Sequence, residues 1–370
     1  MIAGLLGVAL WPLHFGKIIE HYPVPSHARL MAHGMFGGFI FGFLGTALPR
    51  MLSVPALTIP EVLLVFGLHL AMTAAHGAGK TAVGDTLFLT AVGAMTAALF
   101  VRFLRRKDMP PPGFVLVMLA FAGVAAGLVL SFIENRREIS FFAMALERLL
   151  LYQGFILLPV LGVGPFILPR FFGLTSRHEF PESRIPPPGW MNKATGAASA
   201  GLLVVASFVV EAAGWPRAGY LLRLVTTAAY LLREIPVYRA EAKGNSLATA
   251  LKIAFALLLL GLLTIALFPV YRVSLLHLAL VGGFGIITFA VATRVVFGHS
   301  GNQALLSGPN RWLIVAVALM LLGMATRISG DFWPKILVTH YSYGAVLWGL
   351  GVLLWARYVL PKVGQADSEQ

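Results

Sequence analysis

Apolar stretches recur along the whole chain, and the short segments between them carry most of the charged residues and prolines. Each stretch has about 18 to 25 residues, enough for a helix to cross the hydrocarbon core of a bilayer. The pattern predicts an all-α fold, a polytopic bundle of about twelve transmembrane helices. The expected spans are residues 2–19, 30–48, 58–75, 86–104, 114–133, 141–168, 194–213, 220–232, 248–268, 275–297, 312–328 and 337–359. They predict a single transmembrane domain at 1–363, followed by a short polar tail at 364–370.

The loops expected on one face of the membrane contain more lysine and arginine than the loops on the other face. The connection at 102–107, for example, is strongly basic. Because cationic loops stay in the cytoplasm during insertion, we expect both termini to be cytoplasmic. The span at 220–232 is the least regular of the set, since Arg223 interrupts its apolar run.

The composition excludes a soluble domain, because 58% of the residues are hydrophobic and only 12% are charged. The formal net charge of +13 could suit nucleic acid. However, the basic residues are scattered among short loops, as insertion into a membrane requires. Membrane lipid is therefore the expected surrounding, and no nucleic-acid partner is expected.

The chain contains no cysteine and ten histidines. The lack of thiols excludes disulfides, iron–sulfur clusters, thiolate-ligated haem and haem attached covalently through cysteine. Histidine is then the main candidate ligand for a transition metal, with methionine as a weaker one. All the histidines except His178 and His299 are expected in the outer half of the membrane or in outer loops, which suggests a site there.

The stretch from residue 277 to 301 combines glycines with polar residues near both ends. Gly282 and Gly283 would allow close approach of a neighbouring helix or of a flat ligand. About 22 residues separate His277 from His299, or about 33 Å in a helix. The two histidines are therefore expected at opposite membrane faces and cannot share one metal ion.

This stretch resembles the C-terminal signature of the NnrS family, which consists of multispanning bacterial membrane proteins linked to haem, copper and the nitric oxide response. That signature is a histidine, an apolar span with glycine, and then Thr/Ser-Arg-x-x-x-Gly-His-Thr/Ser-Gly. The matching residues are His277, Gly282, Thr293, Arg294, Gly298, His299, Ser300 and Gly301. The family's N-terminal signature, His-x-His-Glu-Met before a glycine-rich span, is matched at His33, Met35 and Gly38. Met31 and Gly34 replace its first histidine and its glutamate.

The resemblance implies b-type haem, copper and a location in the bacterial inner (cytoplasmic) membrane. It also implies nitric oxide or a related small gas as ligand, an electron donor as a further partner, and a link to denitrification. A weaker architectural similarity to haem-copper oxidases points to one pair of haem ligands. Those oxidases hold a low-spin haem between histidines of their second and tenth spans, where this chain has His33 and His277. The sixth and seventh spans contain no histidine, so the copper centre of those oxidases has no counterpart.

The remaining outer histidines are candidates for a copper site, with His69 and His76 preferred because their spacing puts them on one helix face. Because these two are about 10.5 Å apart along a helix, one of them completed by His14, His27 or His340 is expected rather than the pair. For the haem propionates, Arg272 and Arg327 are candidate partners. In the inner signature, Arg294, Gly298 and His299 are candidates for a family-specific role. Glu147 could orient a ligand histidine.

Each of these residues also has a structural interpretation: a hydrogen-bonded interfacial histidine, or an arginine whose charge reaches the headgroups. Two functions therefore compete with a haem- and copper-binding protein. One is a twelve-span secondary transporter, which would place six spans on each side of a longer central loop. The other is an assembly factor without a cofactor. The sequence leaves open whether the protein is an enzyme.

Overall fold

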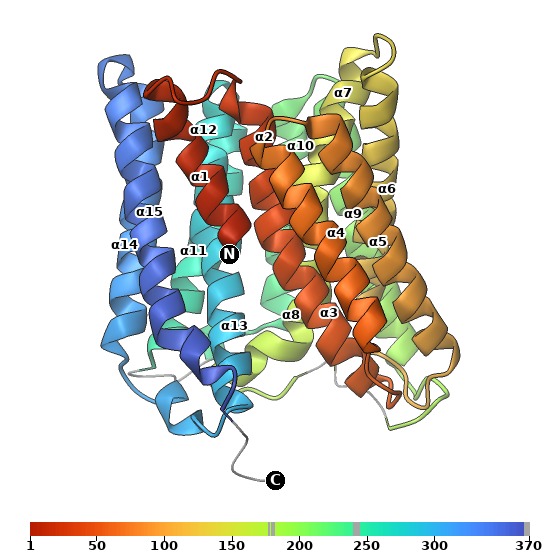
Figure 1. The fold of residues 1–370 in the computed structure, drawn as a ribbon. Helices are drawn as coiled ribbons and strands as arrows, with labels where there is room; N and C mark the ends of the chain where they lie inside the picture. The colour runs from red at the N-terminus through yellow and green to blue at the C-terminus, as the bar shows by residue number, and fades with distance from the viewer. Residues whose placement is uncertain (177, 179–181, 240–244, 366–370) are drawn as a thin grey trace. The chain divides into compact units, whose positions relative to one another are not determined.

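The computed structural model describes the chain up to residue 365, except for residues 177, 179–181 and 240–244. Within these residues every regular element is a helix of α, π or 3₁₀ type (Figure 1). The predicted all-α fold is therefore confirmed. Most of the predicted polar tail, residues 366–370, lies outside the described residues. The boundary at residue 363 and the single domain stay predictions.

The chain divides into two compact units. The first consists of Met1–Gly7, His21–Phe166 and Ser176–Glu234, and the second of Val8–Glu20, Ile167–Thr175 and Ile235–Gln370. Helix α1 (Ile2–Phe15) contributes residues to both units. The helices of the first unit are α2 (Pro23–Arg29), η1 (Leu30–Phe36), α3 (Gly37–Met51), α4 (Ile59–Gly77), α5 (Thr81–Leu104), α6 (Phe114–Glu134), α7 (Phe141–Arg148), η2 (Leu149–Gly154), α8 (Phe155–Ile167), α9 (Trp190–Ala212) and α10 (Pro216–Glu234).

Besides its part of α1, the second unit contains a short 3₁₀-helix and the helices of the C-terminal third of the chain. Its helices are η3 (Leu168–Phe172), η4 (Val237–Arg239), α11 (Ser246–Leu267), η5 (Pro269–Tyr271), α12 (Arg272–His277), η6 (Leu278–Gly285), α13 (Ile286–Gly298), η7 (Gln303–Leu306), α14 (Arg311–Phe332), η8 (Pro334–Ile336), α15 (Leu337–Val359) and η9 (Leu360–Lys362).

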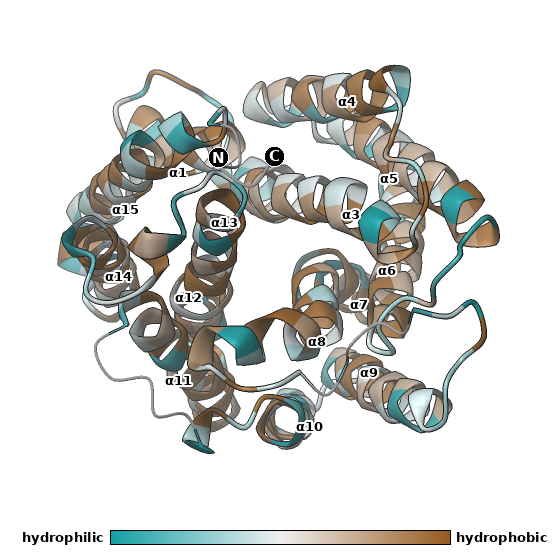
Figure 2. Cartoon of the chain, turned by 90° about the horizontal axis from the view of Figure 1, so that it is seen from below, coloured by the Kyte–Doolittle hydropathy of each residue, from teal (hydrophilic) through white to brown (hydrophobic). Residues whose placement is uncertain are grey.

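Ten helical segments in the described residues are long and apolar enough to cross a membrane. The helix bodies are mostly apolar, whereas hydrophilic residues gather at helix ends and in loops (Figure 2). Large apolar side chains such as Leu63 and Phe66 of α4 are more than half exposed, as expected for contact with lipid. The other two expected spans are also helical. However, α1 has 14 residues, and α10 carries several arginines. The number of spans and the side of the termini stay predictions.

Three of the long segments contain a π-helical turn between two α-helices: η1, η2 and η6. A π-turn widens the helix locally, and such turns often occur at functional sites. Each of the three contains glycine, which lowers the steric resistance to an irregular turn. His33 lies inside η1, and His277 is the residue directly before η6. The sequence pattern did not indicate these irregular turns.

The α4–α5 hairpin in the first unit is held at the end remote from its turn. Thr58 and Glu61 form a capping box at the start of α4, and Pro60 occupies its first turn. The guanidinium of Arg102, near the end of α5, donates to Glu61 Oε2 over 2.7 Å. At the other end the chain reverses between the helices, where Gly79 adopts a φ of 74°. The side chains that face each other near this turn are therefore held in register.

The expected orientation can be tested with cysteines, since the chain has none of its own. Lys80 and Lys107 are exposed and lie at opposite ends of α5. We expect Lys80→Cys in intact cells to react with a membrane-impermeant maleimide and Lys107→Cys to react only after the cells are lysed, because Lys107 belongs to the basic side. Labelling of Lys107→Cys in intact cells would show that the expected orientation is wrong.

Candidate metal centre

His33 is held at the centre of the first unit by the π-turn η1. Its side chain is fully buried and its ring stacks on Phe88, with centroids 4.1 Å apart and planes at 11°. Tyr152 and Phe155 lie close to the same ring, at centroid distances of 5.9 and 6.2 Å. These contacts fix the plane of the imidazole, so its nitrogens point along a defined direction.

His76 and Asp85 face His33 from the α4–α5 hairpin. His76 lies in the last turn of α4, and Asp85 follows it across the turn, near the start of α5. Both side chains are completely buried. Gly84 makes room for the His76 ring, because a Cβ at this position would overlap three ring atoms. The glycine is thus required by the packing of the histidine rather than by the backbone conformation.

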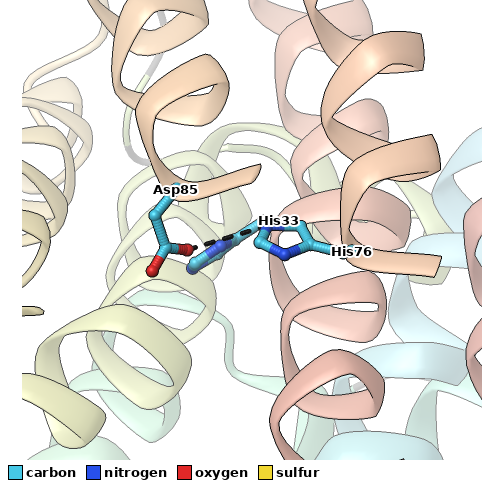
Figure 3. Close-up of side chains that lie close together, drawn as sticks. All are labelled: His33, His76 and Asp85. Carbon is cyan, nitrogen blue, oxygen red and sulfur yellow. Dashed lines mark ion pairs between the residues drawn. The ribbon is translucent and has the colours of Figure 1, made fainter. Parts of the chain in front are cut away.

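The three side chains converge on one point (Figure 3). One ligand atom from each lies within 4.8 Å of the other two, and His76 Nε2 is 3.7 Å from Asp85 Oδ1. None of the ring nitrogens of His33 and His76 has a hydrogen-bond partner among the described residues. Leaving buried polar atoms unpaired costs about 1–3 kcal/mol each. Such a cost is understandable if the nitrogens are metal ligands, because neutral imidazole binds copper, iron and zinc.

The spacing also suits one ion. Two imidazole nitrogens on the same metal are at most about 4 Å apart, since each bond is about 2 Å long. Closing from the observed separation therefore requires only a small movement of the side chains. The cluster of two histidines and one carboxylate has the donor types of a transition-metal site.

Arg29 compensates the charge of Asp85. Its Nε and Nη2 atoms each donate to one carboxylate oxygen over 2.8 Å, in the bidentate arrangement typical of arginine. Ser131 of α6 donates to Asp85 Oδ2 over 3.1 Å, and Arg29 Nη1 donates to the Tyr152 hydroxyl over 3.2 Å. The carboxylate is thus fixed by hydrogen-bond donors from two other elements, α2 and α6. It can orient His76 or complete a metal site without becoming an isolated buried charge.

Glu147 does not contact the histidines in the way that its expected orienting role would require. Its nearest ion-pair partner is Arg29, with Nη2 at 3.9 Å from Oε1, and its side chain is buried. Glu147 therefore belongs to the same charged group as Asp85 and Arg29.

The other histidines predicted as copper ligands lie elsewhere. His69 stands beside Gly38 and packs edge-on against Phe41, outside the three-residue cluster. The Nδ1 atom of His27 bonds to the Gly7 carbonyl over 3.0 Å. In the second unit, His340 Nδ1 bonds to Ser329 Oγ over 2.7 Å, and His14 lies in α1. Within the first unit, the structure thus brings together His33 and His76 and leaves His27 and His69 outside this cluster.

His277, the predicted second haem ligand, belongs to the second unit. Its Nδ1 atom is 2.9 Å from the Val273 carbonyl and 3.2 Å from the Ser274 carbonyl, so Nδ1 carries the proton. The lone pair of the neutral ring is then on Nε2, the tautomer that a metal-ligating histidine commonly adopts. Because His33 and His277 lie in different units, their pairing stays a prediction.

The glycines after His277 are used for helix packing. A Cβ at Gly282 would be 2.7 Å from Leu257 Cδ1, and one at Gly283 would be 2.9 Å from Leu258 Cβ. Of the two expected uses of these glycines, the structure shows the close approach of a helix, α11. Arg327, predicted to bind a haem propionate, already pairs with Asp331 over 2.9 Å. Arg272 is the first residue of α12.

The inner signature residues lie at the far end of α13 from His277. Helical structure is continuous from residue 269 to 298. His277 lies inside this segment and His299 directly follows its last residue, so continuous helix separates the two histidines. Arg294 lies over the ring of Phe171, 4.7 Å from its centroid. Gly298 ends α13, and His299 is exposed.

Sequence reasoning missed Asp85 and Arg29. The expected span began at residue 86, which left Asp85 in a loop, whereas α5 begins at Thr81. A usable signal was present, because a lone carboxylate beside an apolar run and near a histidine-bearing turn is a candidate functional group. Arg29 was counted only among the loop charges, and its bidentate contact depends on tertiary structure.

The contact between Gly84 and His76 can be tested directly. In Gly84→Ala the new methyl group must displace the His76 ring, so we expect the affinity for Cu(I), measured with a competing chelator, to fall about 10- to 100-fold. Gly67→Ala is the matched control, because Gly67 lies on α4 with no atom near its Cβ position. An unchanged affinity in a folded Gly84→Ala protein would show that His76 does not bind the metal.

Comparison with protein families agrees with the sequence and the fold. The family model described as NnrS protein matches residues 1–366, nearly the whole chain. No curated protein matches the chain. With a polytopic helical fold and a match over this length, the chain belongs to the NnrS family, whose members are membrane proteins of the nitric oxide response.

Proposed function

We propose that this protein binds haem and copper within the membrane and handles or senses nitric oxide. The observation that carries the proposal is the buried cluster of His33, His76 and Asp85, in which both imidazoles lack hydrogen-bond partners among the described residues. The family provides the expectation of haem and copper, and the donor atoms of this cluster fit a copper ion. Family membership and the cluster thus support the same function from independent directions.

We assign the copper ion to His33 and His76, with Asp85 as third ligand or as the group that orients His76. Neutral nitrogen donors and a single compensated carboxylate suit copper better than magnesium or calcium, which prefer oxygen. Phe88 shields one face of the His33 ring from any other ligand. The surrounding apolar residues exclude water, so a small uncharged ligand such as nitric oxide would enter more readily than an ion.

Haem would supply an iron centre that binds nitric oxide and exchanges single electrons with a donor. His277 would hold the haem iron through Nε2, because the Val273 and Ser274 carbonyls hold the proton on Nδ1. His33 is the expected second ligand. It cannot hold haem iron and the copper ion through the same nitrogen, so the assignment of His33 decides how the two cofactors are arranged.

Absorption spectra and metal analysis of the purified protein test the function. We expect bound haem and bound copper, because imidazole is the main donor in both expected ligand sets, and a reduced low-spin bis-imidazole spectrum if His33 and His277 hold the iron. His76→Ala should lose copper and keep the haem spectrum, whereas His277→Ala should lose the low-spin spectrum. His299→Ala, at the opposite end of the helix, is the control and should change neither.

His33→Ala separates the two assignments. Loss of the low-spin spectrum would make His33 the haem ligand, and loss of copper alone would place it with His76. If the protein is expressed with haem and copper available and contains neither, the proposal is contradicted. A transporter or an assembly factor would then be favoured.

A further inference from the structure

The buried face of α10 is polar, which is unusual for a helix among membrane spans. Leu221, Val225 and Leu232 are exposed, at 46%, 63% and 53% of their surface. Polar and charged residues, by contrast, face the protein: Tyr220, Arg223, Thr226, Thr227, Tyr230 and Glu234 are all buried. Spacings of four, three and four residues put Arg223, Thr227, Tyr230 and Glu234 on one stripe of the helix. The stripe is about 16 Å long.

At one end of the stripe, Arg223 is fully paired. Its Nε donates to Ser207 over 3.1 Å, its Nη1 to Gln153 Oε1 over 2.5 Å and its Nη2 to Glu211 Oε2 over 2.7 Å. Its guanidinium also lies over the rings of Phe208 and Tyr220. The arginine and Glu211 thus form a buried ion pair in which every donor nitrogen has a partner.

At the other end, a second buried pair lies close to solvent. His178 Nε2 is 3.0 Å from Glu234 Oε2, and both side chains are buried. Arg233 Nε is 3.1 Å from the other carboxylate oxygen, and the Arg233 side chain is 65% exposed. The Glu234 carboxylate therefore connects the interior to a charged group in contact with solvent.

Between the two pairs lie buried hydroxyl groups without partners. The Thr227 Oγ1 and Tyr230 hydroxyl groups have no hydrogen-bond partner among the described residues, and neither does His178 Nδ1. Helical threonines commonly donate to the carbonyl four residues earlier, as Thr264 does over 2.8 Å and Thr293 over 2.7 Å. Thr227 does not. Neighbouring buried polar atoms without partners are the usual surroundings of a bound water molecule.

We propose that this stripe of α10 binds a file of water molecules, a single chain that conducts protons from the His178–Glu234 pair to Glu211. Successive polar groups are three or four residues apart, or about 4.5 to 6 Å along the axis. That distance is too long for direct hydrogen bonds and suits one bridging water at each step. The proposal does not depend on haem or copper.

The transfer is balanced at every step. A proton from solvent binds the Glu234 carboxylate or His178 and passes to the water beside Tyr230. Each water or hydroxyl then accepts one proton and releases another, so it is unchanged afterwards. The Glu211 carboxylate receives the proton, while Arg223 stays protonated throughout. The path ends beside Gln153, which accepts from Arg223. The preceding residue is Tyr152, and the Tyr152 hydroxyl accepts from Arg29 near the metal cluster.

Hydroxyl-radical footprinting of the full chain in lipid nanodiscs tests for the water. Tyr220 and Tyr230 lie on the same helix and are 1% and 7% exposed, whereas Tyr238 is 66% exposed. We expect Tyr230 to be oxidised at least about tenfold faster than Tyr220 and at a rate near that of Tyr238, because a bound water generates radicals beside its ring. Equal rates for Tyr220 and Tyr230 would overturn the proposal.

Thr227→Val removes a hydroxyl that would hold the file, and Thr226→Val changes the neighbouring buried threonine, whose hydroxyl is not among the buried atoms without a partner. We expect Thr227→Val to lower the oxidation of Tyr230 severalfold and Thr226→Val to leave it unchanged, with equal thermal stability of the two proteins as the control for folding. The same oxidation rate in both variants would overturn the role of Thr227.

Time-resolved infrared spectroscopy after an acid jump tests proton transfer itself. Glu211→Gln identifies the Glu211 carboxyl band. In Thr227→Val we expect protonation of Glu211 to be at least about tenfold slower, with the same final extent, because the route changes and the acceptor does not. Equal rates in Thr227→Val and Thr226→Val, or the absence of a Glu211 band after acidification, would overturn the route.

Discussion

The buried ion pair between Arg29 and Asp85 is the interaction on which the site in the first unit depends. Removing one partner of such a pair typically costs about 3–5 kcal/mol, because the other charge remains buried without compensation. Arg29 ends α2 and also bonds to Tyr152 of η2, while Asp85 accepts from Ser131 of α6. The pair therefore fixes the end of α2, and η1 starts at the next residue, one turn before His33. The position of the histidine follows from the position of the charges.

The π-turns show how a membrane helix can present a ligand without breaking its own hydrogen bonds. In the hydrocarbon core an unpaired peptide group is costly, so a helix cannot open into a loop there. A π-turn changes the direction of side chains while keeping backbone bonds, and η1 and η6 do this at the two histidines predicted as haem ligands. His33 lies inside its π-turn, whereas His277 is the last residue of α12, directly before η6.

The sequence was sufficient for the fold class, because the apolar runs that predict helices are local information. His33 and His76 were both named as candidate ligands but for different sites, His33 for haem with His277 and His76 for copper, so the cluster that joins them was not predicted. Asp85 and Arg29 were missed, since their pairing joins helices remote in sequence. The roles of Gly282 and Gly283 were left open for a similar reason: a glycine near a ligand and a glycine at a helix contact have the same sequence signature, and only the neighbours Leu257 and Leu258 distinguish them.

The contact of Gly84 with the His76 ring has a consequence for how the family varies. Because the imidazole occupies the space of a missing methyl group, the two positions are not free to change independently. A relative with alanine or a larger residue in place of Gly84 would retain a histidine at the position of His76 only if its α4–α5 hairpin were spaced differently. Covariation of these two positions across aligned relatives would therefore record the presence or loss of this histidine over evolutionary time.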